Sequence, residues 1–124
     1  MRTIVLVGML LFSFTATAEQ LTSEKVTESE IAALLQQLNH SDCQFIRSGK
    51  KYSGAEAKKH LSGKYDYARD KIKSAESFIE NIASESYFTG KAYLVECSGE
   101  GLVESRIWLT EKLTSYRNKS AEQK

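Results

Sequence analysis

The stretch Ala92-Tyr93-Leu94-Val95-Glu96-Cys97 decides the fold, because it is the clearest β-strand of the chain and ends in a cysteine. Its aromatic and aliphatic residues are of the kind enriched in strands. Turn-forming residues bound it, with Thr89-Gly90-Lys91 before it and Gly99 and Gly101 after it. The apolar pair that follows, 102–103, predicts the returning arm of a hairpin.

The first eighteen residues have the pattern of an export signal. Arg2 supplies a positive charge, residues 4–14 are mostly apolar, and Ala16-Thr17-Ala18 is a small-residue cleavage site. The apolar run is shorter than the ~20 residues that a membrane-spanning helix needs. We therefore expect cleavage after Ala18 and an exported protein that does not span the membrane.

A second short strand, 43–47, begins at the other cysteine and ends at the turn-forming residues 48–50. An even pair of cysteines in an exported chain usually forms a disulfide, so we predict a bond between Cys43 and Cys97. This bond would join the two strands and hold the helices against the sheet. Neither cysteine has a C-x-x-C partner, so the sequence gives no reason to expect a metal site or another cofactor.

Helices are predicted before, between and after these strands. Thr27-Glu28-Ser29-Glu30 is a capping box, and apolar residues follow at helical spacing up to Leu38. A second capping box, Ser53–Glu56, begins a helical pattern that continues to residue 84. One straight helix of that length would measure roughly 46 Å, so we expect a break at Gly63 or at Ser74. A last helix begins near residue 105, with an apolar face formed by Trp108, Leu109, Leu113 and Tyr116.

Together these elements predict a mostly helical α+β fold. Three or four helices should pack on a small antiparallel sheet of two or three short strands, closed by one disulfide. The expected organisation is a signal peptide at 1–18, a flexible N-terminus at 19–26, one domain over 27–117 and a polar tail at 118–124.

Charge is balanced overall and uneven locally. The chain has 17 Lys and Arg against 16 Asp and Glu, and loss of Arg2 with the signal peptide leaves it neutral, which disfavours nucleic-acid binding. Residues 47–73 carry nine Lys or Arg and three acids, whereas residues 76–104 carry six Glu and one Lys. Either the two regions pair internally, or the basic region faces an anionic partner.

One cluster of side chains in the basic region is a candidate site. Glu56, His60 and Lys64 follow one another at i, i+4 and i+8, along one stripe of the second helix. Glu56 could orient His60 as a carboxylate orients a general base. Arg47 and Tyr52 precede the start of this helix, where anions are favoured. We predict ligand binding by Arg47, Tyr52, His60 and Lys64; the alternatives are catalysis by His60 with Glu56 and an ordinary solvated stripe.

Several motifs together carry a resemblance to a known family. They are Cys43-x-Phe45-Ile46-Arg47-x-Gly49, Tyr52, Glu56-Ala57, His60-Leu61, Lys64-Tyr65, Ala75-Glu76-x-Phe78-Ile79, Thr89-Gly90-x-x-Tyr93 and Trp108-Leu109-x-x-x-Leu113-x-x-Tyr116-Arg117. On them the chain resembles the YfeK-like family of small bacterial envelope proteins over nearly all of residues 30–117. It departs at Ser48, where the family tends to have Asn, and at Ala92, where it tends to have Pro. The resemblance implies a periplasmic protein of a Gram-negative bacterium and supplies no reaction.

Three functions are compatible with these observations. We favour a non-catalytic periplasmic protein that binds a protein partner or an anionic envelope component through the basic face around residues 47–64. The second hypothesis is a small hydrolase that uses His60 with Glu56. The third is a purely structural envelope protein with no ligand. An enzyme should have a pocket around His60 with a nucleophile or a water within reach, and a binding protein should have an exposed basic or aromatic patch.

Overall fold

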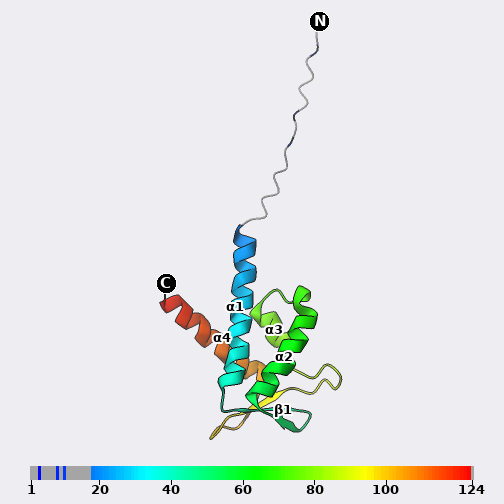
Figure 1. The fold of residues 1–124 in the computed structure, drawn as a ribbon, viewed down its shortest axis with the longest axis vertical. Helices are drawn as coiled ribbons and strands as arrows, with labels where there is room; N and C mark the ends of the chain where they lie inside the picture. The colour runs from blue at the N-terminus through cyan, green and yellow to red at the C-terminus, as the bar shows by residue number, and fades with distance from the viewer. Residues whose placement is uncertain (1–2, 4–7, 9, 11–17, 124) are drawn as a thin grey trace.

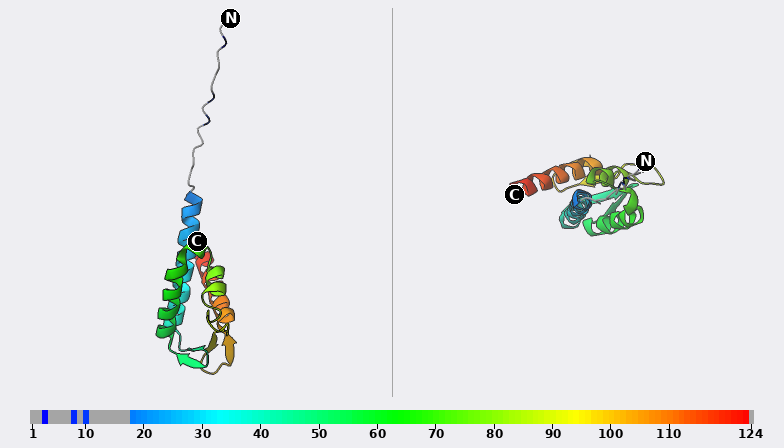
Figure 2. Two further views of the ribbon diagram at one scale, coloured as in Figure 1. Left: turned by 90° about the vertical axis from the view of Figure 1, so that its right-hand side faces the viewer. Right: turned by 90° about the horizontal axis from the view of Figure 1, so that it is seen from above.

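Four α-helices in two layers stand on one end of a small sheet in the computed structural model, which describes residues 3, 8, 10 and 18–123 (Figure 1). One layer contains α1 and α2 and the other α3 and α4, as the view from above shows (Figure 2). This arrangement confirms the predicted α+β class. The helices are α1 (Ala18–His40), α2 (Gly54–Ala68), α3 (Ala75–Asn81) and α4 (Ser105–Glu122).

The sheet has four antiparallel strands in the order β2-β1-β3-β4. They are β1 (Gln44–Arg47), β2 (Lys50–Tyr52), β3 (Leu94–Glu96) and β4 (Leu102–Glu104). The hairpin between β1 and β2 turns at Ser48 and Gly49, whose φ angles of 49° and 79° suit a two-residue turn. The sheet has one strand more than the predicted two or three. The strand missed from the sequence is β2, because β2 begins with two lysines and has no apolar alternation.

The predicted disulfide is confirmed. Cys43 and Cys97 are bonded, with their Cα atoms 4.1 Å apart. Cys43 precedes Gln44, the first residue of β1, and Cys97 follows Glu96, the last residue of β3. Gln44 and Glu96 are paired, so the bond holds together the two central strands. A disulfide is compatible with an exported protein, since such bonds persist in oxidising compartments.

The start of the first helix differs from the prediction. α1 begins at Ala18, so residues 19–26 are helical and the capping-box start at Thr27 was wrong. The carboxylate of Glu30, which a capping box would turn back toward Thr27, instead receives two hydrogen bonds from Arg117 of α4. The predicted signal peptide lies outside the described residues, apart from positions 3, 8, 10 and 18.

The second capping box is present as predicted. The Ser53 hydroxyl accepts from the Glu56 amide and the Glu56 carboxylate accepts from the Ser53 amide, each at 3.2 Å. Gly63 lies inside α2, so a break there was wrong. The helix instead ends at Ala68, a short 3₁₀ turn follows, and Ser74 caps α3 by accepting from the Ser77 amide.

The core lies between the two helical layers and the sheet. Its fully buried large side chains are Ile31, Leu34, Leu38, Phe78, Val95 and Leu109. The apolar periodicity of the predicted helices therefore identified the inward faces of α1, α3 and α4. The C-terminal end of α4 lies at Glu122, so this helix includes most of the predicted polar tail, residues 118–124.

The remaining helix, α2, is fixed by a close approach to the C-terminal end of α1. Gly54 is buried, and a Cβ atom there would overlap the carbonyl oxygen of Leu38. A glycine is therefore needed for the start of α2 to reach this position. In the part of the chain that the structure describes, no helix is long and apolar enough to cross a membrane.

Candidate functional site

The predicted cluster of side chains lines one cavity of about 780 Å³ beside α2. Arg47 comes from β1, Tyr52 from β2, and Glu56, His60 and Lys64 from α2. The cavity is open to solvent, and its wall is mainly apolar. The i, i+4, i+8 spacing thus brought three of the residues together, and the β1–β2 hairpin supplied the other two.

Lys64 does not lie on a solvated stripe. Its ammonium group is partly buried and donates to the Ile82 carbonyl at 2.8 Å and to the Tyr93 hydroxyl at 3.1 Å. The Glu85 carbonyl lies 3.5 Å away. Ile82 is the C-cap of α3, where helix carbonyls lack partners within the helix. Lys64 therefore ties α2 to the end of α3 and to the loop that follows, a role that sequence spacing did not reveal.

His60 is half-buried and contacts the same tyrosine. Its Nε2 atom lies 3.3 Å from the Tyr93 hydroxyl, and the two rings meet edge to face. Burial lowers the pKa of His60 below its ordinary value, and the positive charges of Arg47 and Lys64 lower it further. This lowered pKa favours the neutral imidazole at pH 7. Because the Tyr93 oxygen accepts from Lys64, its own proton is available to a neutral His60 nitrogen.

Glu56 has a different partner from the one predicted for catalysis. Its carboxylate accepts from the Ser53 amide in the capping box. Among the hydrogen bonds and ion pairs of the described residues, none joins Glu56 to His60. The site therefore lacks the carboxylate–imidazole pair that the hydrolase hypothesis requires.

Most cations of the basic region have no acidic partner. Of the nine Lys and Arg in residues 47–73, two form ion pairs with described residues. Lys51 pairs with Glu96, and Arg69 pairs with Glu28 and Asp66. Within the described residues, the other seven have no carboxylate oxygen within 4.0 Å. Internal pairing therefore explains little of the charge asymmetry. The seven are Arg47, Lys50, Lys58, Lys59, Lys64, Lys71 and Lys73.

A second cavity of about 600 Å³ continues the first, and we call the two together the groove. Arg47, His60, Lys64, Tyr67 and Tyr93 line both parts. The second part also contains two aromatic residues that the sequence analysis did not select, Tyr87 and Phe88. Their only sequence signal is that two aromatic residues stand side by side in a segment of turn-forming character.

Tyr87 and Phe88 stand on the segment 84–92, which we call the aromatic loop. Its ends are joined by an isolated bridge between Glu85 and Ala92. Inside it the Ser86 amide donates to the Lys91 carbonyl and the Gly90 amide to the Ser86 carbonyl, each at 2.9 Å. The loop is thus a hydrogen-bonded unit rather than an open connection. Among the described residues, in this loop or outside it, no three His, Cys, Asp or Glu side chains lie close enough together to hold a metal ion.

The environment of His60 predicts a dependence of stability on acidity. Because its pKa is lowered in the folded protein, the unfolded chain binds a proton at higher pH. The stability due to neutral His60 is therefore complete above the ordinary pKa of 6.5 and is lost as pH falls through the folded value. Urea unfolding at a series of pH values should show this loss in the wild type and a smaller one in His60→Gln. The exposed His40 provides the control: His40→Gln should retain the wild-type slope, and a flat wild-type profile would contradict the assignment.

Comparison with known proteins supports the resemblance found in the sequence. A model of a family of unknown function, DUF5329, matches residues 25–117. The uncharacterised protein YfeK of Salmonella typhimurium strain LT2 is 40% identical over 67 residues. That match covers 53% of this chain and 56% of the relative, so the chain spans little more than half of the relative's length. No solved structure matches the chain.

Proposed function

Since this chain belongs to the family of unknown function DUF5329, we propose a function from its own site: it is a non-catalytic periplasmic protein that binds an acidic partner in the groove. The periplasmic location rests on the signal pattern of residues 1–18 and on the disulfide. Mass spectrometry of the protein isolated from cells checks it, with Glu19 expected at the N-terminus. An intact Met1 would contradict it.

The observation that carries the proposal is the excess of unpaired cations along the groove. Arg47, Lys59, Lys64 and Lys71 line it. Glu56 is the single carboxylate among its lining residues, and the Ser53 amide already uses one of its oxygens. A concave surface lined by one sign of charge concentrates ligands of the opposite sign. The groove should therefore attract acidic groups.

The hydrolase alternative has less support. It needs Glu56 to orient His60, and these two side chains hydrogen-bond to Ser53 and Tyr93 instead. The purely structural alternative leaves a groove of unpaired cations unexplained. We therefore place binding first.

Charge reversal in the groove tests the proposal. The double variant Arg47→Glu with Lys59→Glu should bind fluorescein-labelled polyglutamate at least about tenfold more weakly than the wild type, a loss of about 1.4 kcal/mol. Fluorescence anisotropy measures the affinity. Wild-type binding should also weaken between low and physiological salt, where exposed charges are screened over about 8 Å. Lys64 should not be changed in this test, because its bonds to Ile82 and Tyr93 hold the fold together.

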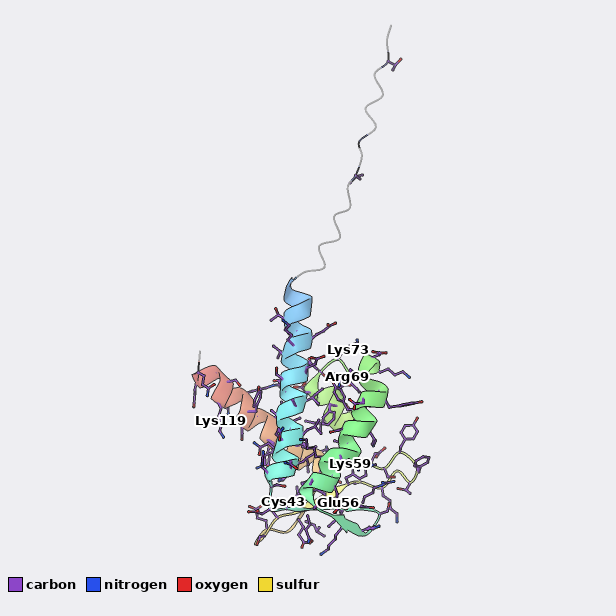
Figure 3. All side chains as sticks on the ribbon, in the orientation of Figure 1. Cys43, Glu56, Lys59, Arg69, Lys73 and Lys119 are labelled. Atoms are coloured by element: carbon purple, nitrogen blue, oxygen red, sulfur yellow. A yellow bond between two sulfur atoms is a disulfide. The ribbon has the colours of Figure 1, made fainter. Side chains whose placement is uncertain are left out.

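The matched control reverses two exposed lysines away from the groove, Lys25→Glu on α1 with Lys119→Glu on α4. Figure 3 shows Lys59 and Lys119 on different helices and far apart. Both double variants make the same change in net charge. Substitution of each of the exposed Lys25, Lys59 and Lys119 should alter stability by no more than about 0.5 kcal/mol. Arg47 is half-buried, so thermal unfolding checks that its double variant is folded. Equal losses of affinity in the two variants, or no binding by the wild type, would overturn the proposal.

A further inference from the structure

We propose that the occupant of the groove is an acidic polypeptide segment with an aromatic anchor residue, which docks between Tyr67 and the aromatic loop. This inference rests on the proposed function and names the partner's chemistry. A second and independent observation, the exposure of three aromatic rings at one place, supports it.

The three rings are almost entirely in contact with solvent. Tyr67 is 95% exposed, Tyr87 87% and Phe88 91%. Tyr67 comes from α2 and the other two from the aromatic loop, yet all three line the same part of the groove. Single exposed apolar side chains are ordinary on a protein surface, whereas a cluster rimmed by polar groups marks an interaction site. Aromatic residues are also enriched at the centres of protein–protein interfaces.

Hydrogen bonds fix the backbone of the aromatic loop before a partner arrives. Its ends pair through Glu85 and Ala92, and Ser86 within it is buried. Lys64 fixes its first turn through the carbonyls of Ile82 and Glu85. The Tyr87 and Phe88 rings pack edge to face with their centroids 6.2 Å apart. A partner therefore meets a loop whose backbone is already ordered, which lowers the conformational entropy lost on binding.

The aromatic rings and the cations share one surface. Arg47 lines both parts of the groove, Lys59 lies in the first part and Lys71 in the second. An occupant that satisfies both features must carry carboxylates and an apolar group at separate points along its length. A polypeptide segment meets this requirement, because acidic and aromatic side chains alternate freely along a chain.

Two other classes of envelope ligand fit less well. A lipid bilayer is flat on this scale and cannot follow a concave groove, whereas a narrow chain can enter it. A glycan needs many hydrogen-bonding partners for its hydroxyl groups, and the groove is lined largely by apolar surface. Arg and Tyr, both present in the groove, are with Trp the residues enriched among the strong contacts of protein interfaces.

The test uses two labelled peptides that differ only in the anchor. One is a short chain of Glu and Asp with two Phe residues, and the other replaces both Phe by Ser. The mature protein, residues 19–124, should bind the Phe peptide at least about tenfold more tightly than the Ser peptide. This ratio corresponds to an anchor that contributes about 1.4 kcal/mol to binding. The variant Tyr67→Ser with Phe88→Ser should lose this preference. The control Leu102→Ser with Ile107→Ser, which changes exposed apolar residues on β4 and α4, should keep it.

The outcomes separate this inference from the proposed function. If both peptides bind equally and the Tyr67→Ser/Phe88→Ser variant changes nothing, while Arg47→Glu/Lys59→Glu still weakens binding, the aromatic anchor is wrong and the anion-binding groove stands. If neither peptide binds and phosphatidylglycerol vesicles bind through Phe88, the occupant is a membrane and the inference is overturned. Thermal unfolding monitored by circular dichroism confirms that each variant is folded, since exposed residues contribute little to stability.

Discussion

Replacing both bonded cysteines, Cys43→Ala with Cys97→Ala, should lower the free energy of unfolding by about 2–5 kcal/mol. The two residues are 54 positions apart, so the bond removes much conformational freedom from the unfolded chain. It also joins β1 to β3, on which the other two strands pair. The whole stability of a domain can be as low as about 5 kcal/mol, and the loss of a native disulfide from a small exported domain often abolishes folding at about 37 °C. Urea unfolding monitored by circular dichroism measures the change.

Reduction of the wild type with dithiothreitol provides the control for this prediction. The reduced wild type should lose about as much stability as the double alanine variant, and the variant itself should not respond to the reductant. A variant that unfolds at the same urea concentration as the oxidised wild type would show that packing alone holds the central strands together.

Arg117→Met should lower the free energy of unfolding by about 1–3 kcal/mol. The guanidinium donates twice to the nearly buried carboxylate of Glu30, at 2.6 and 3.0 Å, and pairs with Glu76 at 2.5 Å. It thereby joins α4 to α1 and α3. Removing it leaves Glu30 unpaired with its side chain only 10% exposed. The expected loss is below the ~3–5 kcal/mol of a fully buried pair, because 44% of the Arg117 side chain is exposed to solvent.

The matched control is Arg106→Met. Arg106 pairs with Glu104 at 3.0 Å, and both side chains are well exposed, so its loss should cost at most about 1 kcal/mol. The pH dependence is a second readout. The hydrogen bond from Arg117 lowers the pKa of Glu76, so its stabilisation is present above the ordinary pKa and is lost as pH falls through the lowered value. Arg117→Met should reduce this acid-dependent component, of which the backbone hydrogen bond at Glu76 supplies the remainder. Equal losses from Arg117→Met and Arg106→Met would contradict the assignment.

The sequence predicted those strands, helices and bonds that depend on residues close together in the chain. The strands at 43–47 and 92–97 were found because apolar runs lie between turn residues, and the disulfide followed from their cysteines. β2 was missed because it is an edge strand that pairs through its backbone and carries lysines, as exposed edges often do. The start of α1 was misplaced because Glu30 was read as part of a capping box. Its carboxylate instead accepts hydrogen bonds from Arg117, which lies 87 residues away in the chain.

The sequence predicted which residues of α2 line the site but not the contacts that they make. Helical spacing identified Glu56, His60 and Lys64 as neighbours, and all three line the groove. The spacing could not show that Lys64 donates to Ile82, because that contact depends on how α2 and α3 pack. The exposed rings on the aromatic loop were missed for the same reason. Only the fold places Tyr87 and Phe88 opposite Tyr67.

Nuclear magnetic resonance titration of the isotope-labelled mature protein tests the central claim, binding of an acidic partner in the groove, most directly. On addition of the acidic Phe peptide, we expect amide shifts to concentrate in α2, in the β1–β2 hairpin and in the aromatic loop. The same titration of Arg47→Glu with Lys59→Glu should show these shifts strongly reduced. Shifts confined to the C-terminal half of α4, around Lys119, or no shifts at saturating peptide, would contradict a binding function for the groove.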